Sequence, residues 1–229
     1  NPLVGRQAEQ RFRVERQILA DLGHPFICRL LDGGATEDGY PYLVMELVDG
    51  TPVDRYCEER RLSTGARLRL FCRICEAVAF AHRNLVVHRD IKPSNVLVDA
   101  EGTPKLLDFG IAKLLDPLAA GPSGVETQAA ERLMTPEYAS PEQVRGGAIT
   151  IATDVYALGA LLYRLLTGRS PHGEPQRGLF ELERAILEEP PPRPSAVAAK
   201  EREISADLDN IVLMALRKEP EGRYATVVQ

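Results

Sequence analysis

The sequence lacks any long uninterrupted apolar run, and no recognisable leader opens it. Its longest apolar segment, Val155 to Leu166, is interrupted by Arg164 and is too short to cross a bilayer. No cationic segment followed by an apolar one stands at the start, so nothing marks the chain for secretion. With 44% hydrophobic residues over 229 positions, we expect one large globular domain, or two small lobes that share a core.

Cysteine is scarce, with only Cys28, Cys57, Cys72 and Cys75 present. The C-x-x-C of Cys72 and Cys75 suggests zinc or a redox pair, but a closed zinc site needs four ligands, and the sequence has no second C-x-x-C or histidine pair. Cys75 also follows the three- and four-residue spacing of an apolar helix face. We therefore interpret all four as reduced thiols and predict a cytoplasmic protein. Membrane anchoring of the full-length protein through a segment outside this chain stays open.

A strong excess of either charge is also missing. The chain has 28 basic and 33 acidic residues and a net charge of -5, which does not favour nucleic acid as a partner. Lysine occurs only five times, and the first is Lys92.

Apolar periodicity and turn residues predict strands near the start of the chain and helices after them. The predicted helices are 6–22, 52–60, 63–84 with Ser63 as its cap, 149–167 ending at Gly168, 179–188 and 207–217. The predicted strands are 26–31, 40–48, 86–87 and 96–98. Asp32-Gly33-Gly34 and Asp38-Gly39 predict turns between the first two strands, which would form a hairpin. Residues 117–128 are small and polar with Gly and Pro, which predicts a mobile loop.

Ionisable and amide side chains separate the predicted strands 86–87 and 96–98. They form H-R-D-x-K-x-x-N from His88 to Asn95, and Asp108-Phe109-Gly110 follows. Burying such groups unpaired costs on the order of several kcal/mol each. Either motif alone is a weak signal, because H-R-D occurs by chance and single Asp and Asn residues usually form turns. Their joint occurrence indicates a functional site.

Together these motifs resemble the catalytic loop (88–95) and the metal-binding loop of eukaryotic-like protein kinases, and bacterial serine/threonine kinases in particular. The resemblance implies a bilobal α+β fold. An incomplete small N-lobe, with a regulatory helix and about two strands, would span 1–47, and a mainly helical C-lobe would span 48–229. The activation segment would be 108–142. The implied cofactors are ATP and Mg²⁺ (or Mn²⁺), and the implied partners are protein substrates bearing Ser or Thr, with no nucleic acid and no membrane segment in this chain.

The same resemblance assigns roles to the motif residues. Asp90 is the base that orients and deprotonates a hydroxyl, and Lys92, whose position is typical of serine/threonine kinases, steadies the transferring phosphate. Asn95 and Asp108 are the metal ligands, and with Lys92 they also contact ATP. Gly110 permits the sharp turn after Asp108. The expected adenine site comprises the gatekeeper Met45, the hinge residues Glu46, Leu47 and Val48, and Leu97 under the ring.

Regulatory and structural positions also match the family. For any one of them, ordinary core packing or a surface ion pair is a sufficient explanation, but their shared order favours the functional interpretation. The implied positions are Glu15 of the regulatory helix; Arg89, which gathers a loop phosphate; Ser123 and Thr127 as phosphorylation sites; Thr135, which contacts the base and substrate; Glu142 of S-P-E, paired with Arg223; Asp154, which supports the catalytic-loop backbone; and Leu19, Leu30, His88 and Phe109, which stack as a spine.

The sequence departs from the family before the catalytic loop. It contains no G-x-G-x-x-G loop and no lysine strand there, so Glu15 has no lysine partner within the chain. One interpretation is part of an active serine/threonine protein kinase, which by itself transfers phosphate weakly or not at all. It is favoured because Asp90, Lys92, Asn95 and Asp108 occur together. The alternatives are a pseudokinase or scaffold and, opposed by the long segment 108–142, a small-molecule phosphotransferase.

Overall fold

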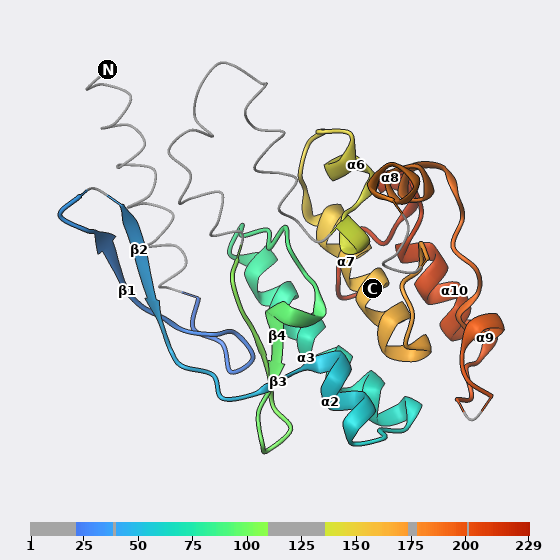
Figure 1. Ribbon diagram of the computed structural model, residues 1–229, viewed down its shortest axis with the longest axis horizontal. Helices are drawn as coiled ribbons and strands as arrows, with labels where there is room; N and C mark the ends of the chain where they lie inside the picture. The colour runs from blue at the N-terminus through green and yellow to red at the C-terminus, as the bar shows by residue number, and fades with distance from the viewer. Residues whose placement is uncertain (1–21, 39, 110–135, 174–177, 201) are drawn as a thin grey trace.

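The computed structural model describes residues 22–38, 40–109, 136–173, 178–200 and 202–229. A β-hairpin lies at one end of the molecule, helices form the other end, and a small three-stranded sheet lies between them (Figure 1). The strands are β1 (Leu30–Ala35), β2 (Pro41–Met45), β3 (Thr51–Pro52), β4 (Val96–Val98) and β5 (Pro104–Leu106). The α-helices are α2 (Val53–Glu59), α3 (Thr64–Arg83), α6 (Pro141–Val144), α7 (Ile151–Thr167), α8 (Leu179–Glu188), α9 (Pro194–Val197) and α10 (Ala206–Ala215); 3₁₀ turns cover Pro93–Asn95, Pro136–Tyr138 and Pro220–Gly222.

The predicted hairpin is present, and of its two predicted turns only the one at Asp38 is found among the described residues. β1 and β2 pair antiparallel from Leu30–Met45 to Ala35–Pro41. Asp32-Gly33-Gly34, predicted as a turn, belongs to β1. Its Gly34 packs so closely under the ring of Tyr42 that a Cβ there would lie 3.0 Å from the tyrosine hydroxyl. The chain turns between Thr36 and Tyr40, as the predicted turn at Asp38 requires, and Thr36 N–H donates to Tyr40 O at 2.8 Å. Cross-strand packing thus overrides the local preference of glycine for turns.

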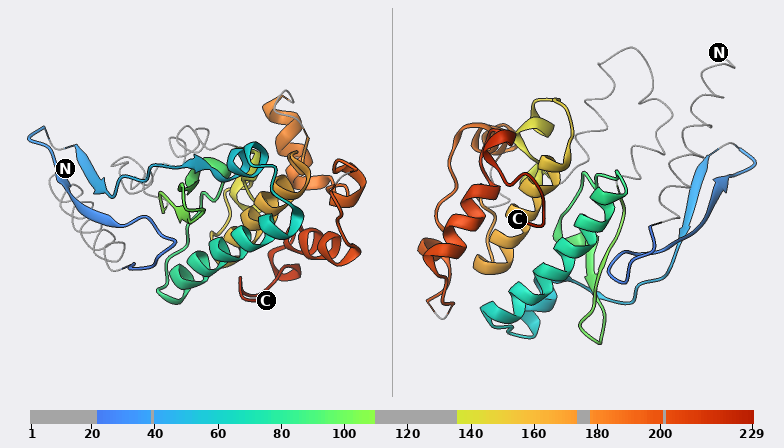
Figure 2. Two further views of the ribbon diagram at one scale, coloured as in Figure 1. Left: turned by 90° about the horizontal axis from the view of Figure 1, so that it is seen from below. Right: turned by 180° about the vertical axis from the view of Figure 1, so that it is seen from behind.

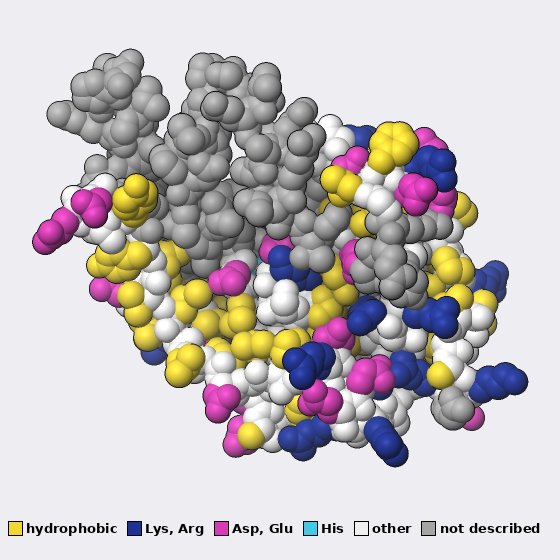
Figure 3. Space-filling view, in the orientation of Figure 1, with side chains coloured by type: hydrophobic (Ala, Val, Ile, Leu, Met, Phe, Trp, Pro, Cys, Tyr) yellow, Lys and Arg dark blue, Asp and Glu magenta, His cyan; other side chains and the backbone are white. Residues whose placement is uncertain are grey.

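The predicted strand 26–31 is wrong in its first half, because residues 26–28 join another sheet. Cys28 N–H donates to Leu106 O and Leu106 N–H donates to Phe26 O, both at 2.8 Å, which forms a parallel bridge between Ile27 and Leu106 of β5. An isolated hairpin is marginally stable in water, and this one exposes Leu31, Tyr40, Tyr42 and Val44. Apolar side chains lie at the surface near this end of the molecule (Figure 3). The bridge to β5 therefore fastens the hairpin to the rest of the molecule. The predicted strand 40–48 is also too long, since β2 ends at Met45.

The three-stranded sheet has the order β3-β4-β5 and is antiparallel throughout. Its middle strand, Val96–Val98, confirms the strand predicted there. The strand predicted at Val86 and Val87 is wrong. Val86 N–H donates to Ala81 O at 3.0 Å, so this residue closes the end of α3 instead of pairing with a strand.

Helix boundaries follow the capping residues. Ser63 Oγ accepts a hydrogen bond from Ala66 N–H at the start of α3, as predicted. Helix α7 begins with a capping box between Thr150 and Thr153 and ends at Gly168 with φ 77°, a left-handed value that glycine adopts without a steric penalty. The predicted helix 179–188 is confirmed without change as α8. The predicted helix 207–217 is slightly displaced, because α10 spans 206–215.

Helix α7 is the centre of the helical part. It lies between α3 and α10 (Figures 1 and 2), and it is buried on nearly every side. One apolar cluster joins α7 to α3 and the sheet, with Leu161, Ile74 and Leu106 among its members. A second joins α7 to α10 through Tyr156 and Val212. A helix that is apolar all round belongs inside a domain, so α7 supports the elements on both sides.

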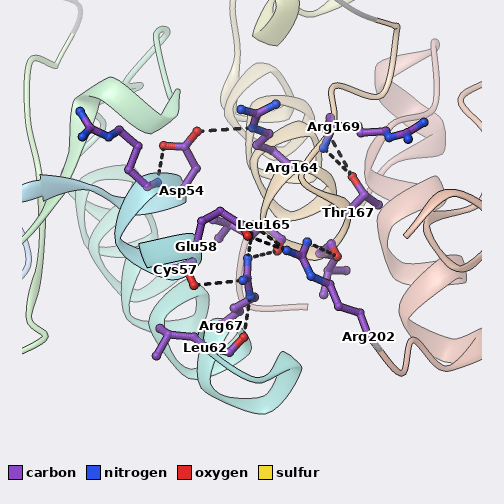
Figure 4. Close-up of polar contacts among 12 residues, drawn as sticks. Asp54, Cys57, Glu58, Leu62, Arg67, Arg164, Leu165, Thr167, Arg169 and Arg202 are labelled. Carbon is purple, nitrogen blue, oxygen red and sulfur yellow. Dashed lines mark hydrogen bonds and ion pairs between the residues drawn. The ribbon is translucent and has the colours of Figure 1, made fainter. Parts of the chain in front are cut away.

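A buried arginine ties α2, α3 and the end of α7 together (Figure 4). Arg67 of α3 is 2% exposed and donates to the carbonyl oxygens of Cys57, Leu62 and Leu165. It also lies 2.9 Å from Glu58 Oε1, and the same carboxylate pairs with Arg202. Because each guanidinium nitrogen of Arg67 has a partner, its charge is held in the interior without an unpaired nitrogen.

Several predicted positions lie outside the described residues. They are helix 6–22 except Leu22, with Glu15 and Leu19; Gly110; the loop 117–128 with Ser123 and Thr127; and Thr135.

Candidate active site

Asp154, in the first turn of α7, is fully buried and anchors the start of the loop 88–95. Its Oδ2 accepts a hydrogen bond from the backbone N–H of His88, and its Oδ1 accepts one from the backbone N–H of Arg89, both at 2.8 Å. The Nε2 atom of His82 lies 2.7 Å from Oδ2. A buried carboxylate needs such donors to offset its lost hydration. The contact therefore fixes the loop backbone to the central helix α7.

His88 connects the loop with the residues that follow β5. It is fully buried, its Nε2 lies 2.7 Å from Leu107 O, and its Nδ1 lies 3.3 Å from the backbone N of Asp90. These partners require Nε2 to donate and Nδ1 to accept, which is the neutral imidazole. Burial lowers the pKa of His88, and the nearby charge of Asp154 only partly opposes this. The imidazole centroid also lies 4.6 Å from that of Phe109.

Two donors from the loop converge on the carboxylate of Asp90. Lys92 Nζ lies 2.8 Å from Asp90 Oδ2, and Asn95 Nδ2 donates to the same oxygen at 2.9 Å. Asn95 Nδ2 also donates to the backbone oxygen of Asp90 at 2.8 Å. No described residue donates to Asp90 Oδ1. The carboxylate is thus oriented through one oxygen, and the other can accept a proton from a substrate group.

Asn95 and Asp108 present oxygen atoms from adjacent segments. Leu107 N–H donates to Asn95 O at 2.8 Å, which places the residue before Asp108 beside Asn95. Because Asn95 engages Asp90 through Nδ2, its Oδ1 lies on the opposite side of the amide group. Asp108 is exposed and has a left-handed φ of 52°. An amide and a carboxylate oxygen suit Mg²⁺, which typically takes one or two carboxylates and completes its shell with water and phosphate oxygens.

The predicted adenine site lies where β2 ends. Glu46 N–H donates to Arg29 O at 2.9 Å, and Glu46 Oε1 lies 2.7 Å from Lys105 Nζ of β5. Burial alone would raise the pKa of Glu46, but its hydrogen bonds from Lys105 and Arg29 outweigh burial and lower it. Met45, Val48 and Leu97 are half-buried. Leu47 is 96% exposed, so its side chain points into solvent.

Glu142 and Arg223 form a two-bond ion pair behind the site. Their Oε1–Nη1 and Oε2–Nη2 distances are both 2.8 Å, and Thr153 Oγ1 donates to Glu142 Oε1 at 2.9 Å. Burial raises the pKa of Glu142, but the hydrogen bonds and charge of Arg223 outweigh it, so the net pKa lies below the usual value. The pair fixes α6, which ends the segment 108–142, to the first turn of α7.

Two further residues of this region were not identified from the sequence. His82 lies in the helix predicted at 63–84 and contacts Asp154. Its one available signal was a polar residue at an apolar position. Gln143, which donates through Nε2 to Arg89 O at 2.8 Å, had no such signal.

Phosphotransferases of the kinase type are the class of protein that this fold and site define. Comparison with protein families supports the same class, because the protein kinase domain matches residues 4–228. The chain therefore belongs to the protein kinase family.

Similar curated proteins include bacterial serine/threonine-protein kinases. PknB of Mycobacterium tuberculosis (strain H37Ra) is 39% identical over 225 residues, which cover 96% of this chain and 34% of PknB. Pkn1 of Myxococcus xanthus is 40% identical over 222 residues, which cover 95% of this chain and 30% of Pkn1. The chain thus spans about a third of the length of these relatives. None of the helices in the described ranges has the length and apolar character needed to cross a membrane.

Proposed function

We propose that this domain transfers the γ-phosphate of ATP to serine or threonine hydroxyls of protein substrates. The observation that carries the proposal is the convergence of Lys92 and Asn95 on one oxygen of Asp90, while no residue in the described ranges donates to the other oxygen. Similarity to PknB and Pkn1, both named as serine/threonine-protein kinases, supports the same reaction.

Each residue of the loop has a separate role in phosphoryl transfer. Asp90 Oδ1 accepts a hydrogen bond from the substrate hydroxyl and takes its proton as the oxygen attacks the γ-phosphorus, while the bond from that phosphorus to the bridging oxygen breaks and ADP leaves. Asn95 and Lys92 keep the carboxylate oriented, and the Lys92 ammonium also offsets charge on the transferring phosphate. Asn95 and Asp108 hold Mg²⁺ (or Mn²⁺), which when bound neutralises the phosphate charges of ATP.

The nucleotide end of the site and the division into lobes complete the proposal. Met45, the backbone of Glu46 to Val48, and Leu97 take the adenine ring. Residues 1–47 belong to the small lobe and 48–229 to the large one. We place the domain in the cytoplasm, supported by its four free thiols and by the need for ATP.

Replacement of the base tests the reaction directly. In the full-length protein, Asp90→Asn should lower kcat by about 10²–10⁴-fold, because general-base catalysis contributes that much. The affinity for Mg²⁺-ATP should change little, since the nucleotide contacts remain. Asp99→Asn is the matched control, because Asp99 caps a nearby turn by accepting from Thr103 N–H at 2.7 Å. Phosphate transfer to a generic serine/threonine substrate and binding of a fluorescent nucleotide are the measurements.

Each contrary result has a distinct meaning. An Asp90→Asn variant that keeps more than about half of the wild-type kcat removes Asp90 from the role of base. A wild-type protein that binds nucleotide but transfers no phosphate favours the pseudokinase alternative instead.

A further inference from the structure

We infer that Gln143 is a positioning residue that holds the catalytic base in place from the end of the activation segment. The inference rests on the proposed function, because it concerns the orientation of Asp90. The backbone conformation of Arg89 and the contacts of the Gln143 amide support it.

Arg89 has an unusual backbone conformation. Its φ is 72°, in the left-handed region that non-glycine residues rarely adopt. Such a conformation persists only where the surrounding structure holds it. Arg89 N–H donates to Asp154 Oδ1, and Arg89 O accepts from Gln143 Nε2, both at 2.8 Å. Helices α7 and α6 therefore hold this residue from its two sides.

The peptide group between Arg89 and Asp90 is held at both of its edges. Its oxygen is the one that Gln143 contacts, and its N–H, which belongs to Asp90, lies 3.3 Å from His88 Nδ1. Rotation of a planar peptide group moves both atoms at once. Its orientation also sets the direction in which the Asp90 side chain leaves the backbone. The bond from Gln143 therefore bears directly on the placement of the Asp90 carboxylate.

The amide of Gln143 is itself oriented by a capping box. Its Oε1 accepts from Ser140 N–H at 3.0 Å, while its own N–H donates to Ser140 Oγ at 3.3 Å. With Oε1 engaged there, Nε2 is directed toward Arg89. The neighbouring residue, Glu142, fixes the same short helix through Arg223. Gln143 thus connects the last turn of the activation segment to the base by a single amide.

Two substitutions separate this contact from the capping box. Gln143→Glu keeps an oxygen for Ser140 N–H but replaces the Nε2 donor with an oxygen that cannot donate when ionised. Ser140→Ala removes the cap hydroxyl and leaves the bond to Arg89 intact. Gln143→Met, which is uncharged and of similar size, shows whether an effect of the glutamate arises from its charge.

We measure kcat, the KM for ATP and backbone hydrogen exchange in full-length protein. Gln143→Glu and Gln143→Met should lower kcat by about 10-fold, a part of what a misplaced general base loses, with the KM for ATP changed less than about twofold. Amides of residues 88–92 should exchange faster in both variants, because the peptide group between Arg89 and Asp90 has lost the hydrogen bond to its oxygen. Ser140→Ala should match the wild type in kcat and in exchange of these amides. If Gln143 had a purely structural role, thermal stability would fall in all three variants. The Gln143 variants would then not differ from Ser140→Ala in kcat or in exchange at residues 88–92.

Two results overturn the inference. One is a Gln143→Glu variant that equals Ser140→Ala in kcat and in exchange at 88–92. The other is loss of kcat in Gln143→Glu alone, with Gln143→Met unaffected, which assigns the effect to the new charge. Asp90→Asn distinguishes a failure of the role of Gln143 from a failure of the role of Asp90. If it is inactive while both Gln143 variants are fully active, only the role of Gln143 fails. If it is active, Asp90 is not the base and the inference loses its premise, whereas a wild-type protein that transfers no phosphate contradicts the proposed function itself.

Discussion

At the scale of single residues, the site depends on side chains that are buried in one protonation state. His88 uses both ring nitrogens as a neutral imidazole, one toward Leu107 O and one toward Asp90 N–H. A proton added to Nδ1 would remove the acceptor for Asp90. Burial keeps that proton off by lowering the pKa of the ring.

This protonation state predicts a pH dependence of stability. Unfolded His88 has the ordinary pKa of 6.5 and the folded group a lower one, so below pH 6.5 the unfolded chain binds more protons. The contribution of neutral His88 is fully present above that pH and is lost as pH falls toward the folded pKa. His88→Gln should therefore flatten the decline in free energy of unfolding between pH 7.5 and 5.5. Urea denaturation at both pH values measures this, and His24, whose pKa is also lowered by burial, is common to both proteins. Equal slopes for the two proteins would contradict the assignment.

At the scale of elements, the short helix α6 is held by far more than its own four residues could provide. Glu142 is 8% exposed and Arg223 is 4% exposed, and Arg223 also donates to the carbonyls of Ala152, Arg217 and Lys218. Isolated helices of this length do not persist in water. The position of α6, and of the segment that ends there, is therefore set by this ion pair.

Breaking the pair should be costly. Arg223→Met leaves Glu142 buried without its partner and should lower the free energy of unfolding by about 3–5 kcal/mol. Arg55→Met is the control, because the Arg55–Glu59 pair has side chains 69% and 56% exposed, and such exposed pairs contribute about 0–1 kcal/mol. Urea denaturation gives both values. Equal losses in the two variants would show that the Glu142–Arg223 pair does not hold α6.

The segment between Asp108 and Glu142 is expected to carry regulatory phosphate. Arg89 is exposed beside the base, and a guanidinium forms charge-assisted pairs with phosphate. Ser123 and Thr127 are the expected sites. Mass spectrometry of active protein should find phosphate there, and Arg89→Lys should weaken the activation it causes, because lysine lacks the two-bond geometry. Unmodified but fully active protein would rule this regulation out.

At the scale of the whole molecule, sequence patterns predicted what depends on near neighbours. Ser63 and Gly168 marked helix ends because capping acts within one turn. The sequence spacing also identified the group of Asp90, Lys92 and Asn95, which lie within five residues of one another. By contrast, His82 and Asp154 are 72 residues apart, and Gln143 and Arg89 are 54 apart. Such pairs are set by packing, as is the place of Gly34 in β1, and no local pattern specifies them.

Three consecutive residues in the first turn of α7 serve three separate segments. Ala152 O accepts from Arg223, Thr153 Oγ1 donates to Glu142, and Asp154 holds His88 and Arg89. Amino-acid substitutions should therefore be tolerated less well in this turn than at positions with a single partner. This turn touches neither ATP nor substrate in the proposed site, yet a substitution of Asp154 removes its hydrogen bonds to the backbone of both His88 and Arg89 at once. In evolutionary terms, the residues that contact the nucleotide can change one at a time. The residues of this turn can change only together with the segments that they contact.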